Sequence, residues 1–372
     1  MLALWMRTSV AAAMLSGVAA TSSVVQDQLD WARSKLAGSA ADPAANAALS
    51  AAITEWRSLS ATNNASFDRY ATFLIAHPGW PNEAQMRRAA EAALTNGVGS
   101  PSTTVAYFRK FPPATSTGWV RFADALNATG ATVEAGTAAR IAWIRGSLSA
   151  TDEARVISTW PGALSPADQD QRMDTLLWQG ATQAAARQLA LTSPARRPIF
   201  AARLAFRTRS PDAGTSTPPG AEYDAGYIAD RAQWLSATGA DGSARSLLAK
   251  PHDLQTRPGD VARWYGLMLR LARSAATAGD NRTAYDIARQ VDDAYPQGTD
   301  ISQQPYGERD AYTDLVWLAG QTALKKLGRP SDAIGMFVRY SNGSRSPALR
   351  TKGLYWAGRA AEAAGRRDEA RE

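Results

Sequence analysis

Two histidines, His77 and His252, are the only side chains in this sequence whose ordinary pKa lies near neutral pH. They are too few for a histidine-rich metal site or an evident catalytic triad. His77 precedes Pro78 at an expected helix end, where a capping role is favoured, and His252 follows Pro251 in a predicted loop. There is no cysteine, which excludes thiolate catalysis, thiolate metal sites, disulfides and an N-terminal lipid anchor on cysteine. We therefore predict no catalytic residue.

Two acidic pairs, Asp168-Gln-Asp170 and Asp292-Asp293, are the nearest approach to a calcium site. Neither lies in a twelve-residue loop that ends in glutamate, so helix starts and solvated turns explain them better. Gly97 begins a Gly-Val-Gly segment that lacks the rest of a phosphate-binding loop. No metal and no cofactor are predicted.

Twelve tryptophans are the remaining candidates, because aromatic rings stack on sugar rings. Those next to turns could line a glycan path: Trp80, Trp119, Trp160 and Trp234. Those within apolar helical runs are expected to fill the core: Trp143, Trp178, Trp264, Trp317 and Trp356. Core packing is the general expectation for any one of them, and an exposed arginine beside an exposed tryptophan would favour glycan binding.

The elements that must position these residues are predicted to be helices. Alanine dominates the apolar residues, and long alternating runs of valine, isoleucine and threonine are missing. The helical pattern is clearest from Asp310 to Glu372, which resembles two copies of a helical hairpin. The last helix of the second copy is predicted to begin near Arg367. In the first copy a stripe with steps of three or four lines one helix face: Tyr312, Val316, Ala319, Ala323 and Leu327.

A glycine followed five residues later by an alanine marks the turns between helices. Glycine permits the left-handed conformation that ends a helix, and a small residue suits the returning helix. The pattern occurs as Gly130/Ala135, Gly180/Ala185, Gly239/Ala244, Gly279/Ala284, Gly328/Ala333 and Gly365/Ala370. Stacked hairpins of this kind form solenoids. The predicted fold is all-α, a right-handed superhelix of degenerate tetratricopeptide-like hairpins that could close into a ring.

Two segments interrupt the helical pattern. Residues 1–20 are predicted to be a signal peptide, with Arg7 before a short apolar core and small residues for cleavage after Ala19 or Ala20; an uncleaved anchor is the alternative. Residues 210–220 contain three prolines and two glycines. We expect them to form a loop within one superhelical domain, residues 21–372, rather than a domain boundary.

The chain is basic, with 41 Lys and Arg against 34 Asp and Glu and a net charge of +7. The basic residues occur singly rather than in blocks, so a generally solvated basic surface is the simplest interpretation. The other interpretation is that the positive charge binds an anionic partner. Export makes nucleic acid improbable as that partner, and no stable membrane span is expected once the signal is cleaved. We predict a periplasmic monomer.

Several segments resemble the superhelical domain of soluble lytic murein transglycosylases. They are Trp317-Leu-Ala-Gly-Gln-Thr-Ala-Leu, Ser346-Pro-Ala-Leu-Arg-Thr-Lys-Gly-Leu-Tyr-Trp-Ala-Gly-Arg-Ala-Ala-Glu-Ala-Ala-Gly, His77-Pro-Gly-Trp-Pro-Asn-Glu, Tyr227-Ile-Ala-Asp-Arg-Ala-Gln-Trp and Gly279-Asp-Asn-Arg-Thr-Ala-Tyr. The resemblance implies a periplasmic enzyme that cleaves the MurNAc–GlcNAc bond of peptidoglycan and leaves a 1,6-anhydro end. In that family a separate lysozyme-like domain performs the chemistry with a glutamate usually followed by serine.

None of the ten glutamates in this chain precedes serine, so no catalytic residue is carried over from the family. We expect the chain to be a non-catalytic part of a longer enzyme, inactive alone, with peptidoglycan and a following catalytic domain as its partners. The alternative is a self-contained periplasmic tetratricopeptide-like scaffold that binds a protein. An all-helical enzyme acting alone is the least favoured interpretation.

Overall fold

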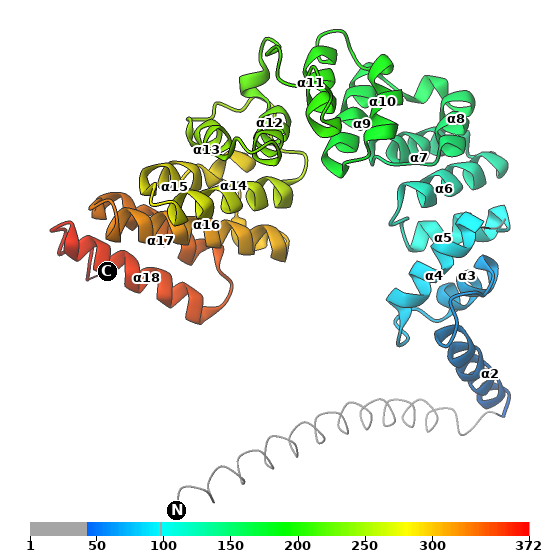
Figure 1. Ribbon diagram of the computed structural model, residues 1–372. Coiled ribbons are helices and arrows are strands. Elements are labelled where there is room, and N and C mark those ends of the chain that lie inside the picture. The colour runs from blue at the N-terminus through cyan, green and yellow to red at the C-terminus, as the bar shows by residue number, and fades with distance from the viewer. Residues whose placement is uncertain (1–42, 97–98, 372) are drawn as a thin grey trace, which may run out of the picture. The chain divides into compact units, whose positions relative to one another are not determined.

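A computed structural model describes residues 43–96 and 99–371 of the chain (Figure 1). These residues form seventeen α-helices, and their only sheet-like contact is one isolated bridge between Asp224 and Thr256. The all-α prediction is confirmed. The predicted signal peptide, residues 1–20, lies outside the described residues. Among the helices that are described, none combines the length and apolarity needed to cross a bilayer.

The helices are short and follow one another closely. In chain order they are α2 (Pro43–Ser60), α3 (Phe67–Ala76), α4 (Glu83–Asn96), α5 (Pro101–Lys110), α6 (Ser116–Ala128), α7 (Thr132–Ile144), α8 (Ala150–Thr159), α9 (Pro166–Gln179), α10 (Thr182–Gln188), α11 (Arg197–Thr208), α12 (Ala225–Ala237), α13 (Asp241–Ala249), α14 (Val261–Thr277), α15 (Asn281–Ala288), α16 (Tyr306–Lys325), α17 (Pro330–Gly343) and α18 (Pro347–Ala363). The predicted last helix near Arg367 is wrong: residues 367–371 form turns. Residues 210–220 form no α-helix, as predicted.

The chain divides into two compact units. One comprises Met1–Ala114 with Arg121–Ala135, and the other comprises Thr115–Val120 with Gly136–Glu372. In the described part of the first unit, α3 packs on α4 and α5, and the rings of Phe67, Tyr107 and Phe108 contact one another. The prediction of a single array through both units stays a prediction.

In the second unit the later helices pack as successive hairpins. Helix α14 contacts α15 and α16, α16 contacts α17, and α17 contacts α18. Their facing sides form one continuous apolar core that includes the fully buried Trp264, Met268, Val316 and Phe337. This arrangement is the solenoid-like packing that the repeated hairpins predict.

The six predicted turn glycines all adopt the left-handed conformation, with φ between 62° and 85°. Five of them have no other heavy atom within 4 Å of the position a Cβ would occupy, so backbone conformation rather than space requires glycine there. At each turn an amide one residue beyond the glycine donates back to a carbonyl in the last helical turn, for example Ala240 N to Leu235 O at 2.8 Å and Asp280 N to Ala275 O at 3.0 Å. The paired alanine is fully buried in five cases, and Ala370 is the exception.

Candidate functional site

The two histidines belong to different units, and each has a structural role. His77 follows the last residue of α3, and its backbone N–H caps the helix by donating to Phe73 O at 2.9 Å, as predicted. The imidazole of His252 is almost fully covered, and its Nδ1 lies 3.0 Å from Asp293 Oδ2. Among the described residues, Asp293 is the only acidic or basic side chain that forms a hydrogen bond or ion pair with either imidazole.

The two acidic pairs do not converge on a metal site. Asp168 forms a capping box with Ser165 at the start of α9, and its carboxylate accepts from Arg140 at 2.7 Å. Burial opposes ionisation of Asp168, but the hydrogen bonds from Arg140 and Ser165 outweigh it and hold the pKa of the carboxyl below its ordinary value. Asp292 accepts from Tyr312 and Arg339. The described residues contain no group of three His, Cys, Asp or Glu side chains placed to hold a metal.

The tryptophans divide only partly as predicted. Trp143 and Trp264 are fully buried, in agreement with the core prediction. Trp160, a predicted glycan-path residue, is buried instead, at the C-cap of α8. Trp178 is 4% exposed, yet its indole forms one wall of a surface groove. With 4% exposure it offers no free face for stacking.

This groove is the most distinctive polar feature of the second unit. It has a volume of about 320 Å³ and lies over α12, with walls from the end of α9, from α11 and from α14. We call it the arginine groove, and its lining residues are Trp178, Arg207, Ala229, Gln233, Arg263, Leu267 and Arg270. Three of the seven are arginines and none is acidic, so the groove presents a positive potential to solvent.

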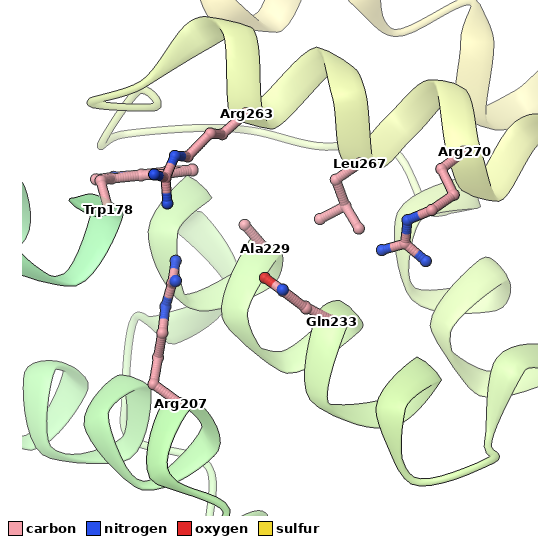
Figure 2. Close-up of a pocket in the computed structure, with 7 residues that line it drawn as sticks. All are labelled: Trp178, Arg207, Ala229, Gln233, Arg263, Leu267 and Arg270. Carbon is pink, nitrogen blue, oxygen red and sulfur yellow. The ribbon is translucent and has the colours of Figure 1, made fainter. Parts of the chain in front are cut away.

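The arginines reach the groove from facing helices. Figure 2 shows Arg207 rising from α11 towards Trp178 and Arg263, while Arg263 and Arg270 extend from α14 on either side of Leu267. Arg263 is half exposed and pairs with Asp260 at 3.1 Å, and the one partner of Arg270 among the described residues is Ser236 Oγ, at 3.4 Å. The amide of Gln233 points into the same space. Like charges that converge in this way favour an anion between them.

A buried ion network fixes Arg207. Asp230 is fully buried, and its two oxygens accept from Arg203 Nε at 2.8 Å and from Arg207 Nε at 2.6 Å. Arg203 also donates to Asp174, and its guanidinium carbon lies 5.6 Å from the centre of the Trp178 ring. Burial opposes the charge of Arg203, but the carboxylates of Asp230 and Asp174 outweigh it and raise the pKa of the guanidinium.

The network depends on a glycine in α12. A Cβ at Gly226 would lie 2.2 Å from the guanidinium carbon of Arg203, so only glycine leaves room for this buried cation. With its Nε held by Asp230, Arg207 keeps its terminal nitrogens free of partners among the described residues, and they line the groove. Its fork is thus preorganised to bind a carboxylate or another planar oxyanion through two hydrogen bonds.

This groove has no direct signal in the sequence, because each of its arginines stands alone and looks like part of a solvated surface. A weak signal does exist. Arg263, Leu267 and Arg270 recur at steps of four and three, so they share one face of α14, next to the face that carries the core residues Trp264 and Met268. Asp230 and Gln233 lie within the Tyr227–Trp234 segment that carries part of the family resemblance.

Comparison of the chain with protein-family models, with curated proteins and with solved structures gave no significant match.

Proposed function

We propose that this chain is the non-catalytic, tetratricopeptide-like superhelical part of a periplasmic lytic transglycosylase, and that the arginine groove binds a carboxylate-bearing strand of peptidoglycan. The observation that carries the proposal is the groove itself, with three arginines and a glutamine lining it and no acid. Carboxylates on the muramic acid units and on the stem peptides make the wall polymer an anionic ligand of matching chemistry.

The groove also suits binding better than catalysis. Its lining contains no carboxylate, histidine, serine or cysteine that could act as acid, base or nucleophile. Arginine stays protonated near neutral pH and donates in a fixed fork, so it orients an anion without exchanging a proton. The role proposed for these residues is therefore to hold and position the polymer, while cleavage of the MurNAc–GlcNAc bond is proposed for a separate catalytic domain.

The test is retention on purified sacculi at low salt, measured as bound fraction after centrifugation. The groove variant is Arg263→Gln with Arg270→Gln, and the matched control is Arg282→Gln with Arg359→Gln. Both control arginines are exposed and lie outside the groove on α15 and α18, so the net charge changes equally. We expect a loss of affinity of about tenfold or more for the groove variant and less than twofold for the control.

Equal losses in the two variants would show that the basic surface as a whole binds the wall, which removes the groove from the proposal. No retention of the wild-type chain at low salt counts against the wall module altogether.

The alternative function is a scaffold that binds a protein partner, and one observation favours it. Leu354 and Tyr355 of α18 are 57% and 58% exposed, and Leu349 on the same helix is 42% exposed. Contiguous exposed apolar surface is typical of interaction sites, and Leu354 and Tyr355 are adjacent in the chain. If the wild-type chain is not retained on sacculi, this scaffold becomes the preferred proposal.

A further inference from the structure

The arginine groove continues past Arg207 into a second hollow. This hollow has a volume of about 190 Å³ and lies between the ends of α9, α11 and α12. Arg207 and Gln233 line both hollows, so the two are adjoining parts of one surface depression. Arg209 and Trp234 line only the second one. The first hollow is at the lower end of the volumes of ligand pockets and the second is below it, so the pair suits consecutive groups on a chain-like ligand.

Arg209 occupies an unfavourable backbone conformation at the end of α11. Its φ of 53° and ψ of 42° are left-handed. Its helix end has the same hydrogen bonds as the glycine-terminated helices: Ser210 N donates to Ala205 O at 3.0 Å, as Ala181 N donates to Leu176 O at 2.9 Å after Gly180. Six other helix ends use glycine at this position. Arginine there is strained, and such strain is often retained at functional sites.

No structural contact explains the arginine. Its side chain is exposed, and it forms no ion pair or side-chain hydrogen bond with the described part of the chain. Glycine would satisfy the same turn without strain. What distinguishes arginine from glycine here is the guanidinium, and Arg209 lines the second hollow together with Arg207.

The charge of the second hollow is positive despite one acid in its lining. Asp230 lines the hollow, but its two oxygens already accept from Arg203 and Arg207 and its side chain is fully buried. The charge left for a ligand is that of Arg209 and the terminal nitrogens of Arg207.

We propose that Arg209, together with Arg207, forms a second anion subsite that binds a further carboxylate of the same polymer strand. The inference rests on the proposed function and deepens it: the ligand spans both hollows and carries carboxylates at more than one point along its length. Two parts of peptidoglycan supply such groups. They are the lactyl carboxylates of a peptide-free glycan strand and the carboxylates of the stem peptides.

The test compares Arg209→Gly with the wild-type chain for two probes, peptide-free glycan strands released by an amidase and soluble disaccharide–peptide monomers. We expect Arg209→Gly to bind at least one probe about tenfold more weakly, since a charged hydrogen bond is lost. The same variant is expected to raise the melting temperature by about 1–4 °C, because the strained turn is relieved. The weakened probe identifies the source of the carboxylate.

The matched control is Asn82→Gly in the first unit. Asn82 is the other non-glycine residue with positive φ among those described, at 64°, and it carries no charge. This control relieves a comparable turn and is expected to leave both affinities unchanged. Arg209→Lys keeps the charge but removes the planar fork, and an intermediate affinity is expected.

Unchanged affinity of Arg209→Gly for both probes, in a chain whose wild type is retained on sacculi, overturns the second subsite and leaves the proposed function standing. Failure of the wild-type chain to bind sacculi or either probe overturns both. A fall in melting temperature for Arg209→Gly would show that Arg209 is structural, and it also contradicts the inference.

Discussion

Replacing Asp230 by asparagine tests the network beneath the groove. Asp230 is fully buried between Arg203 and Arg207, with contacts of 2.8 and 2.6 Å. The substitution removes the charge that both guanidinium groups need and places an amide donor where an acceptor was. Breaking a buried ion pair costs about 3–5 kcal/mol. Because Arg203 keeps Asp174 as a partner, we expect the lower end, about 3 kcal/mol.

The matched control is Asp314→Asn. Asp314 pairs with Arg273 at 2.7 Å, but the two side chains are 47% and 59% exposed, so water replaces the interaction. Exposed pairs contribute about 0–1 kcal/mol. The free energy of unfolding is measured by urea denaturation followed by tryptophan fluorescence, and the melting temperature by calorimetry. At about 2–4 °C per kcal/mol for a unit of this size, Asp230→Asn should lower the melting temperature by about 6–12 °C.

Equal changes in the free energy of unfolding for Asp230→Asn and Asp314→Asn would show that the buried network does not stabilise the fold. A second readout separates support of the groove from simple stability. Arg207 loses the partner that orients it, so retention on sacculi should fall at temperatures where Asp230→Asn is still folded.

Two further predictions concern stability. Gly226→Ala should destabilise the fold by about 3 kcal/mol or more, since the new methyl group would overlap the guanidinium of Arg203. Gly335→Ala lies at an exposed helical site with open space and should instead stabilise the fold by about 0.5–1 kcal/mol. Urea denaturation of the two variants measures both changes in the free energy of unfolding. Asp168→Asn should make stability depend less steeply on pH in acid. The pKa of the Asp168 carboxyl is lower in the folded chain than its ordinary value, so the carboxylate stabilises the fold at pH values above that ordinary pKa. This stabilisation is lost as the pH falls through the pKa of the folded state. Equal slopes for wild type and Asp168→Asn in thermal melts below about pH 4 would contradict the assigned ion pair with Arg140.

The helices and their turns could be predicted because local chemistry decides them. The left-handed backbone at positions 239 and 279 requires glycine, and no neighbouring atom lies within 4 Å of the place a Cβ would take. The predicted stripe on α16 is buried at Tyr312, Val316, Ala319 and Ala323 for the same local reason. The prediction failed near Arg367, where residues 367–371 form turns instead of a helix.

The groove could not be predicted because its parts come from four helices. Trp178, Arg207, Gln233 and Arg270 meet only after the hairpins pack, and no spacing in the sequence links them. Burial of Arg203 was equally hidden, since a lone arginine in a helix ordinarily remains solvated.

The most direct test of the central claim compares retention of the wild-type chain on native sacculi and on sacculi whose carboxylates have been converted to amides. We expect strong retention on native sacculi at low salt, loss of that retention as salt rises, and little retention on the amidated sacculi at any salt. Equal retention on native and amidated sacculi would contradict the claim that the arginine groove recognises the carboxylates of the wall.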